Sequence, residues 1–228
     1  MNARFVTLVL LLFVWLEGDS VWAQYLPKLY QVFSPDKKLK MAIQRHNDGL
    51  LTYTFAANRE ILIKESPLGF KSQETVPSSG WKIEKVSDRK VRDEWKPLWG
   101  KRAVVEDHFN ELVIDLVNPA GQPERMQLVV RGYNDGFAFC YKIPDGKGPC
   151  VNVQSELTAY NFAGDYTAWF YNGENHNIGP EKLTETDGTR LPVMTVKAGD
   201  KHYMAIHEAC LETGAPLVLQ SKGGNRSF

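Results

Sequence analysis

The chain has 228 residues, of which 43% are hydrophobic and 24% charged, with 27 basic and 27 acidic side chains. These values are ordinary for a globular domain and exclude an intrinsically disordered or collagen-like chain. A net charge of zero argues against a nucleic-acid-binding protein, because neutralising phosphates requires a basic surplus. The length suits one large domain or two small ones.

The first 23 residues have the pattern of a secretory signal peptide. Arg4 supplies the positive charge, residues 5–16 are apolar except for Thr7, and Val21-Trp22-Ala23 fits a cleavage site. A membrane anchor is the alternative, but the apolar run is shorter than the about 20 residues that span a bilayer. No cysteine follows the cleavage site, which disfavours a lipid anchor. We therefore expect a mature chain of residues 24–228 that is periplasmic or secreted and has no membrane span.

Three cysteines remain in the mature chain, Cys140, Cys150 and Cys210. Export permits disulfides, but an odd count cannot form a closed internal framework. A bridge between Cys140 and Cys150 on neighbouring strands is one alternative. The interpretation that we favour is free thiols, with Cys140 packed in an apolar strand as a small hydrophobe.

Beyond the signal peptide, the sequence predicts antiparallel β-strands separated by turns. Short runs alternate apolar and polar residues, and no amphipathic helix of ten residues is found. Asp48-Gly49 between two such runs predicts a hairpin with a type I′ turn. The alternating residues of 137–143 place an aromatic stripe on one face, which favours packing against a second sheet. The expected strands are residues 39–45, 50–55, 61–63, 81–86, 111–117, 126–133, 137–143, 193–197 and 203–207.

This pattern predicts an all-β fold, a large antiparallel β-sandwich that forms a single domain after the signal peptide.

Common catalytic motifs are missing. The sequence has no phosphate-binding glycine loop and no Gly-x-Ser-x-Gly, and His207-Glu208 lacks the second histidine of a zinc-protease motif because position 211 is Leu. Asp107 and His108 are adjacent strand residues that point to opposite faces, so we expect structural rather than catalytic histidines.

The stretch of residues 169–181 is the most informative for function. Three aromatic residues end a strand, and a loop rich in Gly, Asn and acidic side chains follows. Carboxylate, amide and carbonyl oxygens are the ligands that calcium takes. Aromatic rings beside polar side chains also suit sugars. The alternative is a turn-rich connection with a solvated Glu174.

A second cluster contains Trp95 and Trp99 on either side of Pro97. The two rings could form a platform that stacks on a flat ligand. Packing in the core is the alternative, since Trp is large and usually buried.

Four separate motifs resemble the N-terminal domain of glycoside hydrolase family 97, a family of exported bacterial α-glucosidases and α-galactosidases. Their order and spacing also agree with that domain, and the resemblance covers about residues 28–219. The motifs are Trp95-Lys96-Pro97-Leu98-Trp99-Gly100, His108-Phe109-Asn110-Glu111-Leu112, Tyr133-Asn134-Asp135-Gly136-Phe137-Ala138-Phe139 and His207-Glu208-Ala209.

The resemblance implies a β-sandwich that precedes a catalytic (β/α)8 barrel. In this family a calcium ion in the active site is bound mainly by barrel residues, with one Glu lent by the N-terminal domain. Glu174 is the best match to that metal ligand, with Glu181 as a substitute. Asn175, His176 and Asn177 are then expected to bind substrate at the rim of the site. The implied substrate is an α-linked oligosaccharide or glycoside.

The chain stops at Phe228, before any barrel, so the two carboxylates that glycoside hydrolysis needs are expected on another polypeptide segment. The expected partner is a family 97 barrel, in cis or from a neighbouring reading frame, and no catalytic residue is assigned to this chain. We expect it to be inactive alone. The alternatives are a free-standing exported carbohydrate-binding module and a decayed fragment.

Overall fold

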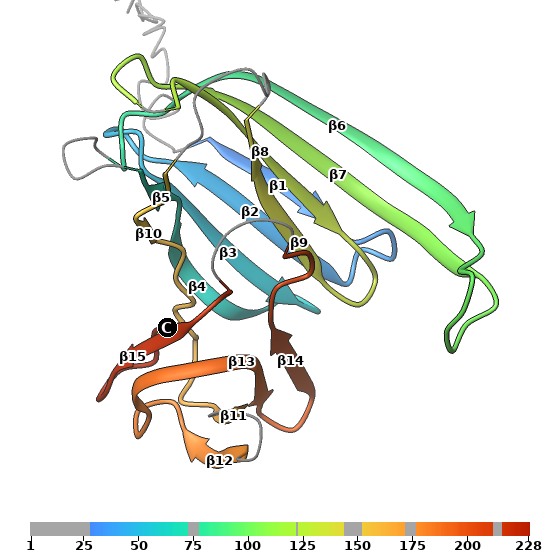
Figure 1. Cartoon of the computed structure of the whole chain (residues 1–228), viewed down its shortest axis with the longest axis vertical. Helices are drawn as coiled ribbons and strands as arrows, with labels where there is room; N and C mark the ends of the chain where they lie inside the picture. The colour runs from blue at the N-terminus through green and yellow to red at the C-terminus, as the bar shows by residue number, and fades with distance from the viewer. Residues whose placement is uncertain (1–27, 73–77, 122, 144–151, 172–176, 212–215) are drawn as a thin grey trace, which may run out of the picture.

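The computed structural model describes residues 28–228 except 73–77, 122, 144–151, 172–176 and 212–215 (Figure 1). Every regular element in these residues is a β-strand, and all strand pairs are antiparallel. The predicted all-β class is therefore confirmed. No helix in the described residues is long and apolar enough to cross a membrane.

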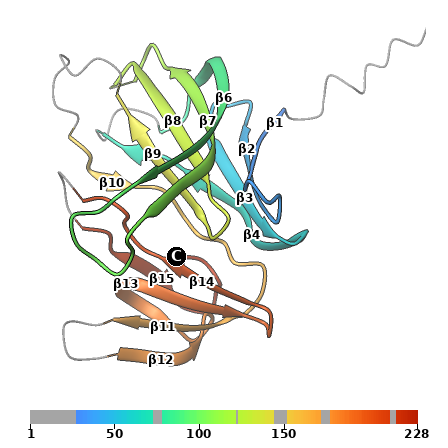
Figure 2. The ribbon, with the colours of Figure 1, turned by 90° about the vertical axis from the view of Figure 1, so that its right-hand side faces the viewer.

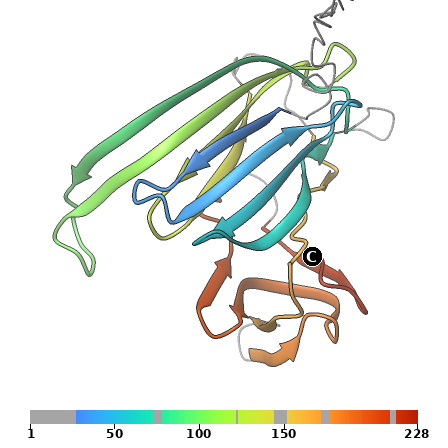
Figure 3. The same cartoon turned by 180° about the vertical axis from the view of Figure 1, so that it is seen from behind.

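The upper part of the molecule in Figure 1 is a sandwich of two four-stranded sheets. The first sheet contains β1 (Leu29–Phe33), β2 (Leu39–Arg45), β3 (Leu51–Ala57) and β4 (Glu60–Leu68) in this order. The second contains β6 (Lys82–Trp95), β7 (Val105–Val117), β8 (Arg125–Gly132) and β9 (Phe137–Lys142) in this order. Figure 3 shows the first sheet from its outer side.

The two sheets bury their alternating apolar residues against each other. Ile43, Ile114 and Leu128 have no exposed surface and belong to one hydrophobic cluster. The aromatic stripe predicted on residues 137–143 packs across this interface, as expected. Its ring contacts, with centroid distances, are Phe55–Phe137 at 5.7 Å, Tyr53–Phe139 at 6.4 Å and Phe70–Tyr141 at 5.4 Å.

A smaller five-stranded sheet, called the small sheet below, lies beneath the sandwich (Figure 2). Its strand order is β12-β11-β13-β14, and β15 pairs with β13. Phe170, Met194 and Val196 on its inner face join the same hydrophobic cluster as the sandwich residues. The strands are β11 (Thr167–Tyr171), β12 (Asn177–Lys182), β13 (Asp187–Ala198), β14 (His202–Ile206) and β15 (Leu219–Lys222).

The segment of residues 157–163 attaches the small sheet to the sandwich. It runs along the outer edge of β4, where the Lys64 amide donates to the Asn161 carbonyl at 2.7 Å and the Ala163 amide donates to the Leu62 carbonyl at 2.9 Å. The Tyr160 amide in turn donates to the Phe228 carbonyl at 2.8 Å. These bonds cover an edge that would otherwise expose unpaired backbone groups. A short ribbon of β5 (Phe70–Lys71) and β10 (Ser155–Glu156) continues the attachment.

The β6–β7 hairpin is longer than the rest of its sheet. The β7–β8 pairing ends at Asn110 and Gly132, whereas β6 and β7 stay paired as far as Trp95 and Val105. Figures 1 and 3 show the far half of the hairpin standing clear of the body. The sequence predicted only residues 81–86 and 111–117 here, because the extension is mostly charged and has no buried face.

The predicted hairpin at Asp48-Gly49 is present, but its turn type differs from the prediction. Only Gly49 has a positive φ, of 86°, and the His46 amide donates to the Leu50 carbonyl across a five-residue loop. A type I turn followed by one left-handed residue fits a loop of this length. The two consecutive positive φ angles that a type I′ turn needs occur instead at Asn58 and Arg59, between β3 and β4.

Cys140 is a free thiol but is exposed on the edge strand β9, so the expectation that it packs in the core is wrong. It lies on the outer face of the strand, opposite to the aromatic stripe. Cys210 is also exposed. Cys150 and the predicted signal peptide of residues 1–23 lie outside the described residues.

Candidate functional site

Of the four site residues predicted from the sequence, the structure describes Asn177, which lies at one end of the small sheet. Glu174, Asn175 and His176 lie outside the described residues. Asn177 is the first residue of β12 and is exposed. It pairs with Tyr171, the last residue of β11. The structure therefore places the two flanks of the predicted site side by side.

Asn177 lies on the outward face of the small sheet. Tyr171 pairs with Asn177 on one side and with Leu191 on the other, so these three side chains share one face. Along β13, Leu191 and Val193 are exposed and alternate with the half-buried Pro192 and the buried Met194, which puts Leu191 and Val193 outward and Met194 inward. Tyr171, Leu191 and Val193 are all among the exposed large hydrophobic residues. This face is an apolar and aromatic surface, and the chain beside it continues into the polar sequence of residues 172–177.

This exposed apolar face was not predicted from the sequence. The run Leu191-Pro192-Val193-Met194-Thr195-Val196 carried a signal, because apolar residues occupy both faces of the strand. A strand with two apolar faces is typical of one that is covered on both sides. Within the described residues, only the inner side is covered.

Glu181, the substitute metal ligand, is held by neighbours on the small sheet. Its Oε1 accepts a hydrogen bond from Thr186 Oγ1 at 3.0 Å and lies 3.4 Å from Arg190 Nη2. Arg190 also lies over the Phe170 ring, with 5.8 Å between the guanidinium carbon and the ring centroid. Glu181 is thus engaged in an ion pair, which disfavours it as a metal ligand.

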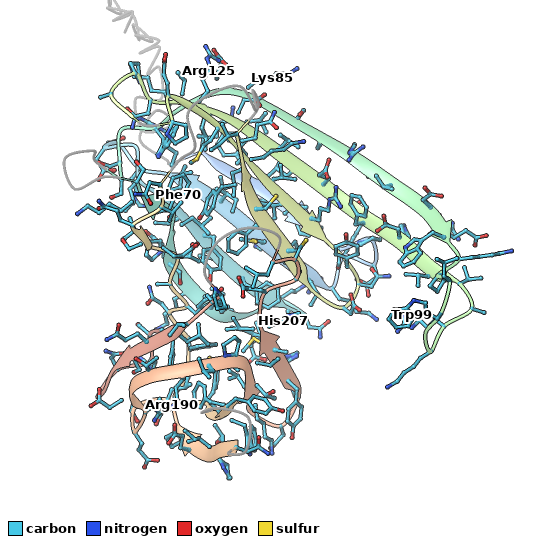
Figure 4. All side chains as sticks on the ribbon, viewed as in Figure 1. Phe70, Lys85, Trp99, Arg125, Arg190 and His207 are labelled. Carbon is cyan, nitrogen blue, oxygen red and sulfur yellow. The ribbon has the colours of Figure 1, made fainter. Side chains whose placement is uncertain are left out.

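A second exposed aromatic surface lies at the far end of the β6–β7 hairpin. Trp95 is 54% exposed and Trp99 is 88% exposed. Figure 4 shows Trp99 in this loop, far from Arg190 on the small sheet. The alternative that Trp95 and Trp99 pack in the core is therefore wrong, because the described part of the chain leaves both side chains exposed.

The carboxyl groups with a displaced pKa do not have the properties of a general acid. A hydrogen bond from Arg89 lowers the pKa of Glu111, a bond from Ser34 lowers that of Asp36, and a bond from Arg125 lowers that of Glu84. An acid that protonates a glycosidic oxygen needs a raised pKa. These three groups are structural anions. No group of three or more His, Cys, Asp or Glu side chains in the described part of the chain is placed to hold a metal ion.

Two of the described histidines, His46 and His207, also have structural partners. The His46 ring lies 2.9 Å from Thr52 Oγ1 and 3.0 Å from Glu65 Oε1. The His207 ring bonds the carbonyl oxygen of Glu208 rather than its carboxylate. That carboxylate accepts the Leu217 amide instead, at 2.8 Å.

Comparison with known proteins gives one family. A family profile described as "Glycosyl-hydrolase 97 N-terminal" matches residues 32–227. A probable retaining alpha-galactosidase of Streptomyces bingchenggensis (strain BCW-1) is 26% identical over 203 residues, which are 88% of this chain and 28% of the relative. The chain therefore spans less than a third of the length of this curated relative.

Solved structures agree with this result. A glycoside hydrolase family 97 enzyme of Pseudoalteromonas sp. strain K8, solved in complex with panose and with acarbose, superposes with a TM-score of 0.74 at 26% identity. The match covers 86% of this chain and 31% of that enzyme. A beta-arabinopyranosidase superposes with a TM-score of 0.67 at 20% identity, and the match covers 77% of this chain and 31% of that enzyme. At this identity the match shows the shared fold alone.

Proposed function

The chain belongs to glycoside hydrolase family 97, as its N-terminal domain, and we propose that it completes the sugar- and calcium-binding site of a (β/α)8 catalytic barrel. The described residues contain no such barrel. The observation that carries the proposal is the outward face of the small sheet. There Tyr171, Leu191 and Val193 expose apolar surface beside the segment of residues 172–177.

The proposed substrate is an α-linked oligosaccharide or glycoside. The Pseudoalteromonas enzyme was solved with panose and with acarbose, and the Streptomyces relative is named an alpha-galactosidase. Aromatic rings next to amide side chains suit such a ligand, because rings pack on the apolar C–H faces of a sugar while amides bond its hydroxyls. Tyr171 and Asn177 offer this combination in adjacent strand positions. We propose Asn175, His176 and Asn177 as rim residues that bind the substrate.

Calcium is proposed as the shared cofactor, with Glu174 as the ligand from this domain. Carboxylate and amide oxygens are hard ligands that calcium prefers, and residues 174–177 supply them. When bound, the cation would supply positive charge that orients sugar hydroxyls. The chain's own contribution would be to position one carboxylate and to exclude water with the apolar face of the small sheet.

The test is reconstitution of activity. The whole chain is co-expressed with the part of the Pseudoalteromonas enzyme that follows its matched segment, and release of nitrophenol from p-nitrophenyl α-glucoside and α-galactoside is followed with and without calcium. We expect turnover from the pair and none from this chain alone. Turnover by the chain alone, or no activity and no association of the pair, would contradict the proposal.

Glu174→Gln tests the metal ligand in the reconstituted pair. Loss of a residue that only supports a metal ligand lowers metal affinity by about 10-fold or more. Glu174→Gln removes a charged ligand itself, so we expect a larger fall in apparent calcium affinity. Glu124→Gln is the matched control, since Glu124 is an exposed carboxylate at the far end of the sandwich. Equal calcium affinity in both variants would show that Glu174 is not a ligand.

A free-standing carbohydrate-binding module is the second candidate, favoured by the exposure of Trp95 and Trp99. In that case the chain alone should bind maltotriose or soluble starch, and Trp99→Ala should abolish binding. Isothermal titration of the purified chain separates the two functions, since the first candidate predicts sugar binding only with the barrel.

A further inference from the structure

The far half of the β6–β7 hairpin is not supported by the rest of the domain. From Val105 to Phe109, β7 pairs only with β6, because its pairing with β8 ends at Asn110. An isolated two-stranded hairpin is marginally stable in water. This hairpin is also not needed for the core, since the buried residues of β7 begin at Phe109. Its length is therefore explained by something outside the described sandwich.

The hairpin ends in an unusual concentration of exposed apolar side chains. We call Trp95, Leu98, Trp99 and Val104 the hairpin tip. Leu98 is fully exposed, and Val104 is also among the exposed large hydrophobic residues. Single apolar residues on a surface are normal, but a group of four on one protrusion marks an interaction site. Trp in particular is enriched among the residues that dominate binding energy at protein interfaces.

Like charges face each other directly below the hairpin tip. Asp93 pairs with Asp107 across the strands, and Glu94 pairs with Glu106. Like charges directly opposite in a sheet are destabilising. In the described residues, none of these four carboxylates forms an ion pair within 4.0 Å. The tip loop itself adds exposed cations, at Lys96, Lys101 and Arg102.

These features favour a protein partner over a sugar. A neutral sugar cannot compensate opposed carboxylates or bury a fully exposed Leu98, whereas a protein surface can offer an apolar pocket with charges of both signs around it. The relatives indicate which protein this is. The matched segment is only 28% of the Streptomyces relative and 31% of the Pseudoalteromonas enzyme. Each therefore carries a large remainder for such a domain to contact.

We propose that the hairpin tip docks into an apolar pocket on the catalytic part of a family 97 glycosidase, with the opposed carboxylates of β6 and β7 paired to basic side chains at its rim. This inference rests on the proposed function. The docked hairpin would form a second point of attachment, separate from the small sheet. Two separate attachments would fix the orientation of the small sheet relative to the barrel.

The experiment measures association of the whole chain with the co-expressed catalytic part of the Pseudoalteromonas enzyme. Leu98→Ser combined with Trp99→Ser should weaken association by about 30-fold or more, the effect of losing interface hot spots. The matched control is Ile61→Ser on β4, which removes an apolar side chain that is 54% exposed and lies away from the hairpin. We expect the control to associate like wild type, and all variants to keep the wild-type circular dichroism spectrum and melting temperature.

A charge reversal separates docking from a purely structural role. Glu94→Lys places a cation opposite Glu106, so the free chain should be as stable as wild type or more stable. Association should nevertheless weaken by about 10-fold, because a rim pair is replaced by repulsion. If stability and association fall together, the hairpin charges are structural and the proposal is wrong.

The remaining outcomes are also decisive. Wild-type association that the tip substitutions do not change would overturn this inference and leave the proposed function standing. No association of the wild-type pair would overturn both. Sugar binding by the chain alone that depends on Trp99, or a dimer of this chain that the tip substitutions dissociate, would assign the hairpin tip to another partner and overturn the inference.

Discussion

At the residue scale, Glu111 shows how one buried charge is held in an otherwise apolar architecture. Its side chain is only 6% exposed, on the outer face of β7, and both oxygens are bonded, to Arg89 on β6 and Arg131 on β8. The guanidinium of Arg131 also lies over the Phe109 ring at 4.4 Å. One carboxylate thus ties three neighbouring strands together just where the free part of the hairpin begins.

We expect Glu111→Gln to lower the free energy of unfolding by about 1 kcal/mol at pH 7, because two charge-assisted hydrogen bonds are weakened. Hydrogen bonding by Arg89 lowers the pKa of Glu111. A lowered carboxyl pKa contributes stability above the unfolded pKa and loses it as the pH falls through the folded pKa. The difference between wild type and variant should therefore shrink below about pH 4. Urea unfolding at pH 7 and pH 3 checks this, and an equal difference at both pH values would contradict it.

At the element scale, the hairpin turns are set by close contacts as much as by local sequence. Gly49 has a φ of 86°, and a Cβ at this position would lie 2.4 Å from the Trp81 amide nitrogen and 2.5 Å from that of Gly80. The β2–β3 turn is therefore packed directly against the start of β6. The Arg45 side chain strengthens this contact by donating to the Trp81 carbonyl at 2.6 Å.

Gly49→Ala should destabilise the fold by about 2–3 kcal/mol, since left-handed backbone strain adds to a clash with backbone atoms that cannot move aside. Gly136→Ala is the control, because a Cβ there meets nothing within 4 Å. It should change stability by less than about 0.5 kcal/mol. Thermal unfolding of both variants followed by circular dichroism is the measurement, and equal melting temperatures would refute the role of the contact.

At the scale of the whole molecule, the sandwich and the small sheet share one core. Phe228 is buried between them, with ring centroids 5.5 Å from Phe170 on β11 and 6.3 Å from Phe162. His202 on β14 and Glu60 on β4 add a polar contact between the two parts at 3.5 Å. We infer that the face of the small sheet that carries the predicted site is held rigidly by the sandwich.

We expect Phe228→Ala to cost about 3–5 kcal/mol, the usual effect of removing a buried aromatic ring. Near- and far-ultraviolet circular dichroism should report one coincident unfolding transition in both wild type and variant. Leu98→Ala serves as the control, since this fully exposed side chain should not affect stability. Two separate transitions in wild type would mean that the small sheet unfolds independently.

The sequence by itself determined the fold class, most strand positions and the family. Alternation of apolar and polar residues is a local property, and it is clearest in β8, where every second residue is buried. The motifs around Trp95 and Asn134 identified family 97, which the family profile confirms. The predicted ligands Glu174, Asn175 and His176 remain predictions.

Only the tertiary structure decided which strands share a sheet and which surfaces are left uncovered. The bridges Ile63–Phe162 and Asn161–Ser227 join residues far apart in the chain, so no local pattern encodes them. For the same reason Trp99 was ambiguous in the sequence. The same apolar residue is core or interface according to what packs on it, and that is fixed by distant contacts rather than by neighbours in the chain.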